Sequence, residues 1–381
     1  MDKQLLDIYS DYLLCSFGQT TATGLSELLD GAISHDKITR FLSGSDFTSA
    51  DLWQLVKPLV RPLQSQEAVL VFDDSLEEKH YTDESELICW HWDHCFNRTI
   101  KGVNFLTCLY HTPTAALPVA FELIKKSEWT TDKKTNKPRR VCPKTKNETK
   151  NEYLREMVTQ CQKNQLPFRY VLADAWFSSA DTMVFLKKDC HTDFLFPLKA
   201  NRKVALSQAD KSAGRYQPVS SVPLEANAIQ AIWLEGVDFP LLLCKQVFLL
   251  CKQVFLLCKQ VFLLCKQVFT NKDDSQGVLY LTTSDTTLSS SALSTIYQKR
   301  WKIEEYHKSV KSNASFAKSP TKTVRTQSNH IFACLWAYVK LESIRLKNHL
   351  NHFAMKGRIY KAALASAYRE LQILKNETAT A

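Results

Sequence analysis

The sequence lacks both the cysteine pattern of a structural zinc site and the long apolar run of a secretory signal. Its 12 cysteines include no C-x2-C pair, and no cluster of histidines and cysteines has zinc-ligand spacing. Because four of the cysteines belong to one repeated unit and the others are scattered, we expect reduced thiols in a cytoplasm. The N-terminal residues mix charged and apolar side chains, so we expect no signal peptide.

The chain is long and basic. Its 381 residues can bury a sizeable core, and we expect two or three lobes. The formal net charge of +10 and the isoelectric point of about 8.9 favour a polyanionic partner. In other respects the composition is that of a soluble globular protein.

The N-terminal 66 residues predict a helical lobe. Apolar side chains recur at helical spacing in residues 2–14, 24–29, 35–42 and 51–63. The segment SHDKITRFLSG resembles the second helix of a helix-turn-helix and carries Lys37 and Arg40 near one face. This resemblance favours DNA binding by the two cations, and an ordinary helical bundle is the alternative.

Two short apolar runs end in carboxylates. Residues 68–75, AVLVFDDS, predict a buried strand that ends at Asp73 and Asp74, and residues 168–174 predict another that ends at Asp174. Further strands are expected at residues 102–111, 116–123 and 192–197, with helices at 151–162 and 180–188. Three adjacent strands followed by alternating helices and strands predict an α/β fold, in which a mixed sheet is flanked by helices.

Between these strands lies a basic segment. Residues 125–150 hold ten lysines or arginines and three acids, and Pro138 and Pro143 favour an irregular loop. A cationic loop beside a nucleic acid gains free energy from counterion release, so we expect DNA contact through residues such as Arg139 and Arg140. The alternative is a solvent-exposed loop that does not contact DNA.

A seven-residue unit, LLCKQVF, occurs four times without a mismatch in residues 242–269. A perfect repeat suggests a recent tandem duplication, and one copy with the residues that follow would form a strand, a turn and a strand. A membrane span is not expected, because each lysine near a bilayer centre would cost roughly 2.5–3.5 kcal/mol. The repeated VFLLC sequence favours aggregation wherever it is exposed.

Residues 297–311 predict a helix with one polar stripe. On a wheel of about 100° per residue, the stripe gathers five polar side chains: Tyr297, Arg300, Glu304, Lys308 and Lys311. A carboxylate placed among cations can hold a divalent metal while its neighbours hold phosphates. A solvated face with i,i+4 ion pairs is the alternative.

The spacing Tyr297-x2-Arg300-x3-Glu304-x6-Lys311 resembles the Y-x2-R-x3-E-x6-K signature of bacterial insertion-sequence DDE transposases. The resemblance implies an RNase H-like catalytic core, with acids at the ends of the first and fourth strands and a third acid on a helix. On this sequence the three acids correspond to Asp73, Asp174 and Glu304, with Asp74 as the alternative to Asp73.

Three carboxylates without histidine or cysteine suit hard divalent cations. We therefore expect two Mg²⁺ or Mn²⁺ ions to be held by Asp73, Asp174 and Glu304, because converging acids repel each other unless metals neutralise them. Two such ions can activate a water or a 3′-hydroxyl for attack at phosphorus. The polar stripe would then position a DNA phosphate.

The resemblance further implies cut-and-paste transposition by end cleavage and strand transfer. The expected partners are the terminal inverted repeats and target DNA, with a homodimer in synapsis, no membrane, and a bacterial cytoplasmic location at the nucleoid. In such relatives an insertion-domain tryptophan stacks on a flipped base, and Trp233 is its counterpart here. A core tryptophan is the alternative.

Five segments are expected: an N-terminal DNA-binding lobe (1–66), a first core part (67–200), an insertion domain with the repeat (201–276), a second core part (277–325) and a C-terminal helical region (326–381). Two other functions remain open. One is a catalytically impaired copy that still binds DNA, because the repeats fall in the insertion domain. The other is an RNase H-like nuclease without strand transfer.

Overall fold

The computed structural model describes residues 1–93, 97–132, 136, 138–142, 149–248 and 277–379. The chain divides into two compact units. The first unit holds Met1–Ser65, Asp73–Glu148 and Lys302–Ala381, and the second holds Gln66–Phe72 and Thr149–Trp301. Strand β1 (Val69–Glu78) therefore contributes its apolar beginning to the second unit and its acidic end to the first.

The first unit begins with the helices expected from the sequence. They are α1 (Lys3–Cys15), α2 (Ala22–Leu28), α3 (His35–Ser43) and α4 (Ser49–Val60), followed by the short helix η1 (Arg61–Leu63). Each α-helix starts at a polar residue whose side chain accepts a hydrogen bond from a backbone N–H of the first turn. At α4 the exchange is mutual, because Thr48 and Asp51 form a capping box.

The sheet of the first unit is built around the long strand β3 (Arg98–His111). Strand β3 pairs in antiparallel fashion with β2 (Cys89–Asp93) and β4 (Ala116–Leu123), and the end of β1 also lies beside it. Gly102 allows this close approach, because a Cβ there would lie 2.1 Å from the carbonyl oxygen of Glu77. The predicted strands at 102–111 and 116–123 are confirmed.

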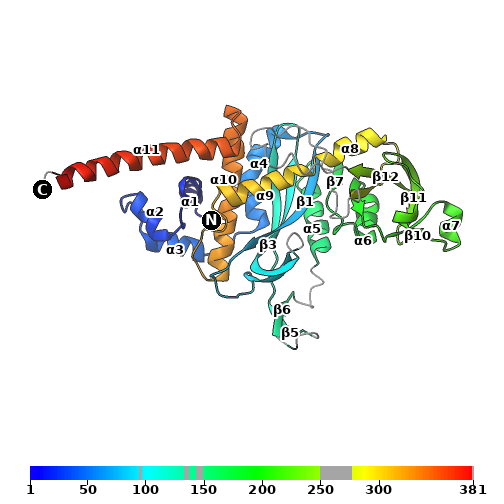
Figure 1. Cartoon of the computed structure of the whole chain (residues 1–381), viewed down its shortest axis with the longest axis horizontal. Helices are drawn as coiled ribbons and strands as arrows, with labels where there is room; N and C mark the ends of the chain where they lie inside the picture. Colours follow the sequence, from blue (N-terminus) through cyan, green and yellow to red (C-terminus); the bar gives the residue numbers. More distant parts are fainter. Residues whose placement is uncertain (94–96, 133–135, 137, 143–148, 249–276, 380–381) are drawn as a thin grey trace. The chain divides into compact units, whose positions relative to one another are not determined.

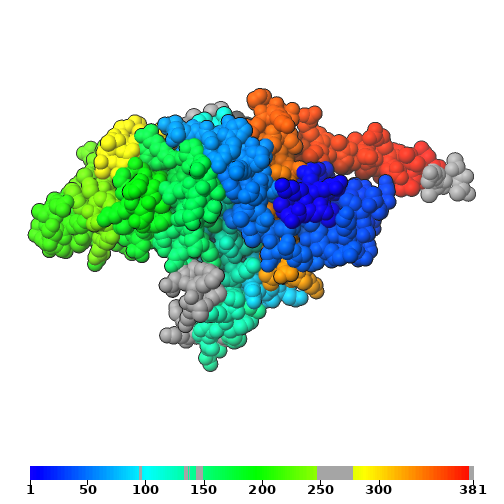
Figure 2. Space-filling model, turned by 180° about the vertical axis from the view of Figure 1, so that it is seen from behind, coloured from blue at the N-terminus to red at the C-terminus, as the bar shows by residue number. Residues whose placement is uncertain are grey.

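Three helices complete the first unit. Helix α9 (Trp301–Asn313) is followed by α10 (Val324–Asn348) and α11 (His352–Ala379), so the predicted helical tail is confirmed. Helices α4 and α10 pack on β4, the strand that pairs with the β3 labelled in Figure 1. In the space-filling view the blue N-terminal helices lie against the orange α10 (Figure 2), in agreement with the contacts of α10 with α1 and α3.

The basic segment corrects one expectation. In place of an irregular loop, β5 (Glu128–Thr131) and β6 (Pro138–Val141) form an antiparallel pair. Pro138 does not prevent it, because it is the first residue of its strand, where the loss of a backbone donor is tolerated. Pro143 lies outside the described residues.

The second unit contains the parallel part of the fold. Strand β7 (Tyr170–Leu172) pairs in parallel with the beginning of β1 and with β8 (Asp193–Leu198). The unit also includes helices α5 (Lys150–Lys163) and α6 (Ala180–Val184), and a π-helical turn at Phe185–Asp189 continues α6. With both strand directions and flanking helices, the α/β fold class expected from the sequence is confirmed.

The region expected to be an insertion is rich in strands. It contains β9 (Lys203–Ala205), α7 (Gln208–Ser212), β10 (Gln217–Pro218), η3 (Val219–Ser221) and β11 (Ile229–Leu234). Strand β12 (Leu241–Phe248) takes up the first repeat copy and pairs in antiparallel fashion with β13 (Gly277–Thr283). One copy thus forms a strand, as predicted, and the other three lie outside the described residues.

The expectation of one uninterrupted helix over residues 297–311 is wrong. Helix α8 (Ser290–Gln298) ends before α9 begins at Trp301. At the junction the amides of Lys299 and Arg300 donate to carbonyls three residues earlier, at 3.1 and 2.9 Å, which is the tighter bonding of a turn. A single helical wheel therefore does not describe Tyr297 and Glu304 together.

Candidate metal centre

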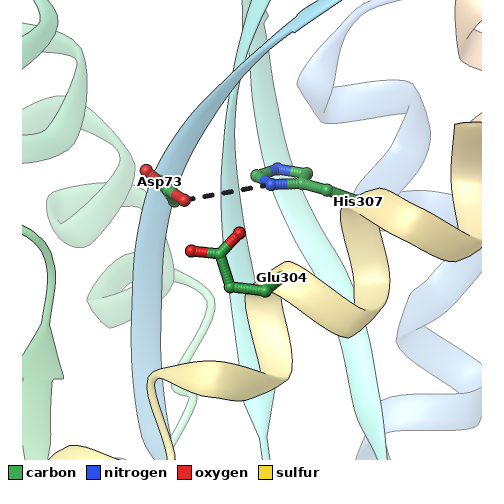
Figure 3. Close-up of side chains that lie close together, drawn as sticks. All are labelled: Asp73, Glu304 and His307. Atoms are coloured by element: carbon green, nitrogen blue, oxygen red, sulfur yellow. Dashed lines mark ion pairs between the residues drawn. The ribbon is translucent and has the colours of Figure 1, made fainter. Parts of the chain in front are cut away.

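A cluster of potential metal ligands lies in the first unit. Asp73 belongs to β1, and Glu304 and His307 belong to the first turns of α9. One ligand atom from each of the three side chains lies within 4.8 Å of the others. Figure 3 shows Glu304 and His307 directed from the helix toward the aspartate on the strand. The fold therefore brings Asp73 together with Glu304 and His307, which lie more than 200 positions later in the sequence.

Packing and hydrogen bonds hold α9 against β1. Ile303 and Val310 are fully buried, as expected for the apolar face of this helix. Lys311 binds the end of the strand, because its Nζ donates to the Leu76 carbonyl oxygen at 2.6 Å and lies 3.2 Å from Glu77 Oε2. These contacts fix the helix that carries Glu304 relative to the strand that carries the aspartate.

His307 is the most buried member of the cluster. Only 5% of the residue is exposed, and its Nδ1 lies 3.9 Å from Asp73 Oδ2. Burial, with a smaller contribution from the cation of Lys311, lowers the pKa of His307 to about 3. The imidazole is therefore neutral at physiological pH and presents a nitrogen lone pair.

The two neighbouring aspartates of β1 have different surroundings. Asp73 takes part in the cluster, whereas Asp74 Oδ2 accepts a hydrogen bond from Asn104 Nδ2 at 3.0 Å. Successive side chains of a strand point to opposite faces, so only one of the two carboxylates can face α9. The geometry favours Asp73 as the ligand.

Asp174 belongs to the second unit and follows β7. Its Oδ1 accepts a hydrogen bond from the Trp176 amide at 2.8 Å, which holds the turn that leads to α6. The cap of α6 is Ser179, so Asp174 does not serve as the helix N-cap. Trp176 is largely exposed, and Lys199 Nζ lies 3.9 Å from the centre of its ring.

The other members of the predicted polar stripe are divided between the units. Tyr297 and Arg300 belong to the second unit, where the guanidinium lies 5.6 Å from the phenol ring centre. Lys308 belongs to the first unit and is exposed, with its Nζ 5.2 Å from the ring centre of Phe353.

Lys37 and Arg40 lie on the exposed side of α3, and the opposite side of this helix buries Ile38 and Leu42. Helices α2 and α3 contact each other and are joined by a short connection. This arrangement leaves both cations accessible to a phosphate backbone.

The predicted DNA-binding residues Arg139 and Arg140 lie on β6. Arg139 is 3.3 Å from Asp132 and mostly exposed. Arg140 is mostly buried, with an ion pair to Glu84 at 3.4 Å and its guanidinium 4.4 Å from the ring centre of Trp129. Trp233 lies on β11, partly exposed, and its indole nitrogen is buried without a hydrogen-bond partner among the described residues.

His307 is not among the site residues expected from the sequence. The sequence carried a usable signal, because Glu304-x2-His307 is a pair at i,i+3 spacing and such residues share one face of a helix. The expected polar stripe does not include His307, because Tyr306 and Val310 predict that this part of the helix is buried.

Two family profiles match this chain. The profile described as "DDE superfamily endonuclease" matches residues 2–223, and that described as "Transposase DDE domain" matches residues 128–340. Each match spans more than half of the chain. The chain belongs to the DDE transposase family. No curated protein matches the sequence.

One solved structure similar to this DDE transposase is the "Drosophila P element transposase strand transfer complex". The identity is 11%, the match covers 53% of this chain and 45% of the other, and the TM-score is 0.26. The transposase thus spans less than half of that chain. At a TM-score of 0.26, the similarity supports no conclusion about the fold of this protein.

Membership of a DDE endonuclease superfamily implies dependence on a divalent metal ion. The residues of this transposase fit such an ion, because two carboxylates and an imidazole converge, and the imidazole Nδ1 lies 3.9 Å from Asp73 Oδ2. Among the described residues, no helix is both long and apolar enough to cross a bilayer.

Proposed function

We propose that this DDE transposase excises its own insertion sequence and joins it to target DNA. Asp73, Asp174 and Glu304 hold two Mg²⁺ or Mn²⁺ ions in this proposal. The observation that carries it is the meeting of Asp73 with Glu304 across a large sequence separation. Asp174 follows a parallel strand next to β1, where an acid of such a site is expected.

The side chains have separate roles. The carboxylates would hold the two metal ions, which when bound would supply activation of a water or a 3′-hydroxyl and stabilisation of the leaving oxygen. Arg300, Lys308 and Tyr297 bind a phosphate near the scissile bond. Lys311 secures α9 against β1 through Leu76 and Glu77 and adds positive charge there.

Further surfaces bind the rest of the DNA. Lys37 and Arg40 of α3, and Arg139 with Arg140 on β6, contact the phosphates of the terminal inverted repeats, and Trp233 stacks on a base. Synapsis requires a homodimer, which α11 supports because it exposes apolar side chains at helical spacing: Tyr360, Leu364, Tyr368 and Leu371. The protein acts at the nucleoid in a bacterial cytoplasm.

An excision assay tests this function. The donor plasmid carries a marker between the inverted repeats found in the DNA that flanks this reading frame. Wild type is expected to excise the marker in Mg²⁺ or Mn²⁺, and Asp73→Asn, Asp174→Asn and Glu304→Gln each to reduce excision by at least about a thousandfold. Asp74→Asn is the matched control and should retain most of the excision.

The same assay separates the two alternatives. Binding of the ends without excision by the wild type would favour an impaired copy, for which the repeat within the β-rich region gives a reason. Metal-dependent cleavage of DNA without inverted repeats, and no strand transfer, would favour a general nuclease. Excision that survives in the three acid variants would contradict the proposed site.

A further inference from the structure

We infer that His307 is a ligand of the metal ion held by Asp73 and Glu304, so that this ion has a nitrogen donor as well as oxygen donors. The inference rests on the proposed function. It assigns to this chain a metal site of the composition Asp-Glu-His on one face of α9 and the adjoining strand.

Two buried histidines of the same unit show why His307 needs an explanation. The ring of His330 is satisfied as a core residue, with Nδ1 3.0 Å from the Tyr9 hydroxyl and Nε2 3.2 Å from the Ser315 carbonyl oxygen. His307 has no comparable set, because its Nε2 is buried without a hydrogen-bond partner among the described residues. Its Nδ1 instead lies 3.9 Å from Asp73 Oδ2, so the ring nitrogen with a polar neighbour is the one that points to the acidic cluster.

The environment of the ring aims it at the carboxylates. Phe105 and Tyr306 flank the imidazole, with ring centres 5.3 and 5.2 Å away, and limit its movement. Figure 3 shows the ring on the same side of α9 as Glu304 and facing Asp73.

The distance between His307 and Asp73 fits a shared ion. The 3.9 Å from Nδ1 to Oδ2 exceeds the length of a hydrogen bond. One ion with bonds of about 2.0–2.2 Å to each atom spans such a separation.

A nitrogen ligand alters the preference of the site. Carboxylate oxygens suit Mg²⁺, Ca²⁺ and Mn²⁺ alike, whereas imidazole favours transition metals. We therefore expect Mn²⁺ to bind this transposase more tightly than Ca²⁺ or Mg²⁺, by a margin that depends on His307. Binding of Mn²⁺ is the appropriate probe, since it reports on the ligand without requiring DNA cleavage.

Pulsed electron paramagnetic resonance on the full chain with one equivalent of Mn²⁺ tests the inference. The wild type is expected to show nitrogen modulation from a directly bound imidazole, and the modulation should change to the ¹⁵N pattern after labelling of histidine. His307→Phe should abolish the modulation and weaken Mn²⁺ binding about tenfold or more, with a smaller change for Mg²⁺. Tyr306→Phe, a neighbouring ring in the same helix, is the matched control and should retain the modulation.

The outcomes separate this inference from the proposed function. Mn²⁺ that binds the wild type without nitrogen modulation, while Asp73→Asn abolishes binding, overturns the role of His307 and leaves the acidic site intact. Unchanged Mn²⁺ binding in both Asp73→Asn and Glu304→Gln overturns the metal site itself. If His307→Phe fails to fold, the ¹⁵N labelling of the wild type still decides the question.

Discussion

At the residue scale, the two adjacent aspartates of β1 have the same chemistry and different surroundings. They lie in the middle of the strand, which continues to Glu78 and does not end at them as the sequence predicted. Asp73 faces Glu304 and His307, whereas Asp74 accepts a hydrogen bond from Asn104. The sequence limited the choice to these two residues, because both follow the buried run of β1. It could not decide between them, since the choice depends on which face of the strand receives α9.

Substitution of the two aspartates gives a direct test. Mn²⁺ at about 100 times its dissociation constant is expected to stabilise the wild type by about 2.7 kcal/mol. Asp73→Asn should lose this metal-dependent stabilisation, and Asp74→Asn should keep it while losing some intrinsic stability. Thermal melts with Mn²⁺ and with a chelator measure both effects, and a metal response lost only in Asp74→Asn would reverse the assignment.

At the scale of single elements, α9 depends on the two helices that follow it. Glu342 of α10 is buried, accepts a hydrogen bond from the Ala116 amide at 2.9 Å and lies 3.0 Å from His352 Nε2. The other ring nitrogen, Nδ1, lies 2.8 Å from Ser309 Oγ on α9. This chain of contacts links the helix that carries Glu304 to α10 and α11.

Removal of the charge at Glu342 is expected to destabilise the first unit. Burial alone would raise the pKa of Glu342, but hydrogen bonds from His352 and Arg345 outweigh it and lower the pKa from 4.5 to about 2. Because the pKa of Glu342 is lower in the folded state than in the unfolded state, its ionised carboxylate stabilises the fold above pH 4.5. This contribution is lost as the pH falls toward 2. Glu342→Gln should therefore lower the free energy of unfolding by about 3 kcal/mol at neutral pH.

Denaturant titrations of wild type and Glu342→Gln at a series of pH values measure this effect. The difference between the two proteins should be constant above pH 4.5 and should shrink below it. A difference that does not change with pH would show that the carboxylate charge is not the source of the stability. Lys302→Gln is the control, because it removes a charge from a side chain of α9 that is 44% exposed. It should change the free energy of unfolding much less than Glu342→Gln does.

The repeated segment makes a second prediction at this scale. One copy of LLCKQVF is sufficient for β12, which pairs with β13. Deletion of the other three copies, residues 249–269, should raise solubility because it removes the repeated VFLLC sequence. Mn²⁺ binding should be unchanged. A thermal melt that shows an unfolded protein after the deletion would contradict this prediction.

The elements that could be predicted are those with local signals. Polar caps such as Thr48 and Ser34 mark where helices begin, and the apolar run before Asp73 marks a buried strand. The break at Lys299 and the β5–β6 pair were missed because neither has a glycine or a strong alternation to reveal it. The i,i+3 spacing of Glu304 and His307 places both on one face of α9, but the 3.9 Å between His307 and Asp73 depends on packing between distant segments and has no local signal.

At the scale of the whole molecule, the positive charge should govern DNA binding. The net charge of +10 favours phosphate contacts, each of which makes the logarithm of the binding constant fall more steeply with the logarithm of salt concentration. If Lys37 and Arg40 each contact a phosphate, the double variant Lys37→Gln/Arg40→Gln should reduce this slope by about 1.8. Fluorescence anisotropy over a range of salt concentrations measures it.

The control for this experiment is Lys3→Gln/Lys57→Gln, which removes the same charge from exposed positions of α1 and α4. Its slope should remain close to that of the wild type. Equal losses in both double variants would mean that net charge alone sets the affinity and that α3 has no special part in it.

The central claim is that Asp73, Asp174 and Glu304 meet at divalent metal ions. Anomalous diffraction at the manganese edge, from crystals of the full chain with Mn²⁺ and DNA of its inverted-repeat ends, tests it most directly. The account predicts manganese peaks about 2.2 Å from carboxylate oxygens of all three residues. Manganese bound elsewhere, with Asp174 far from the other two acids in the DNA complex, would contradict it.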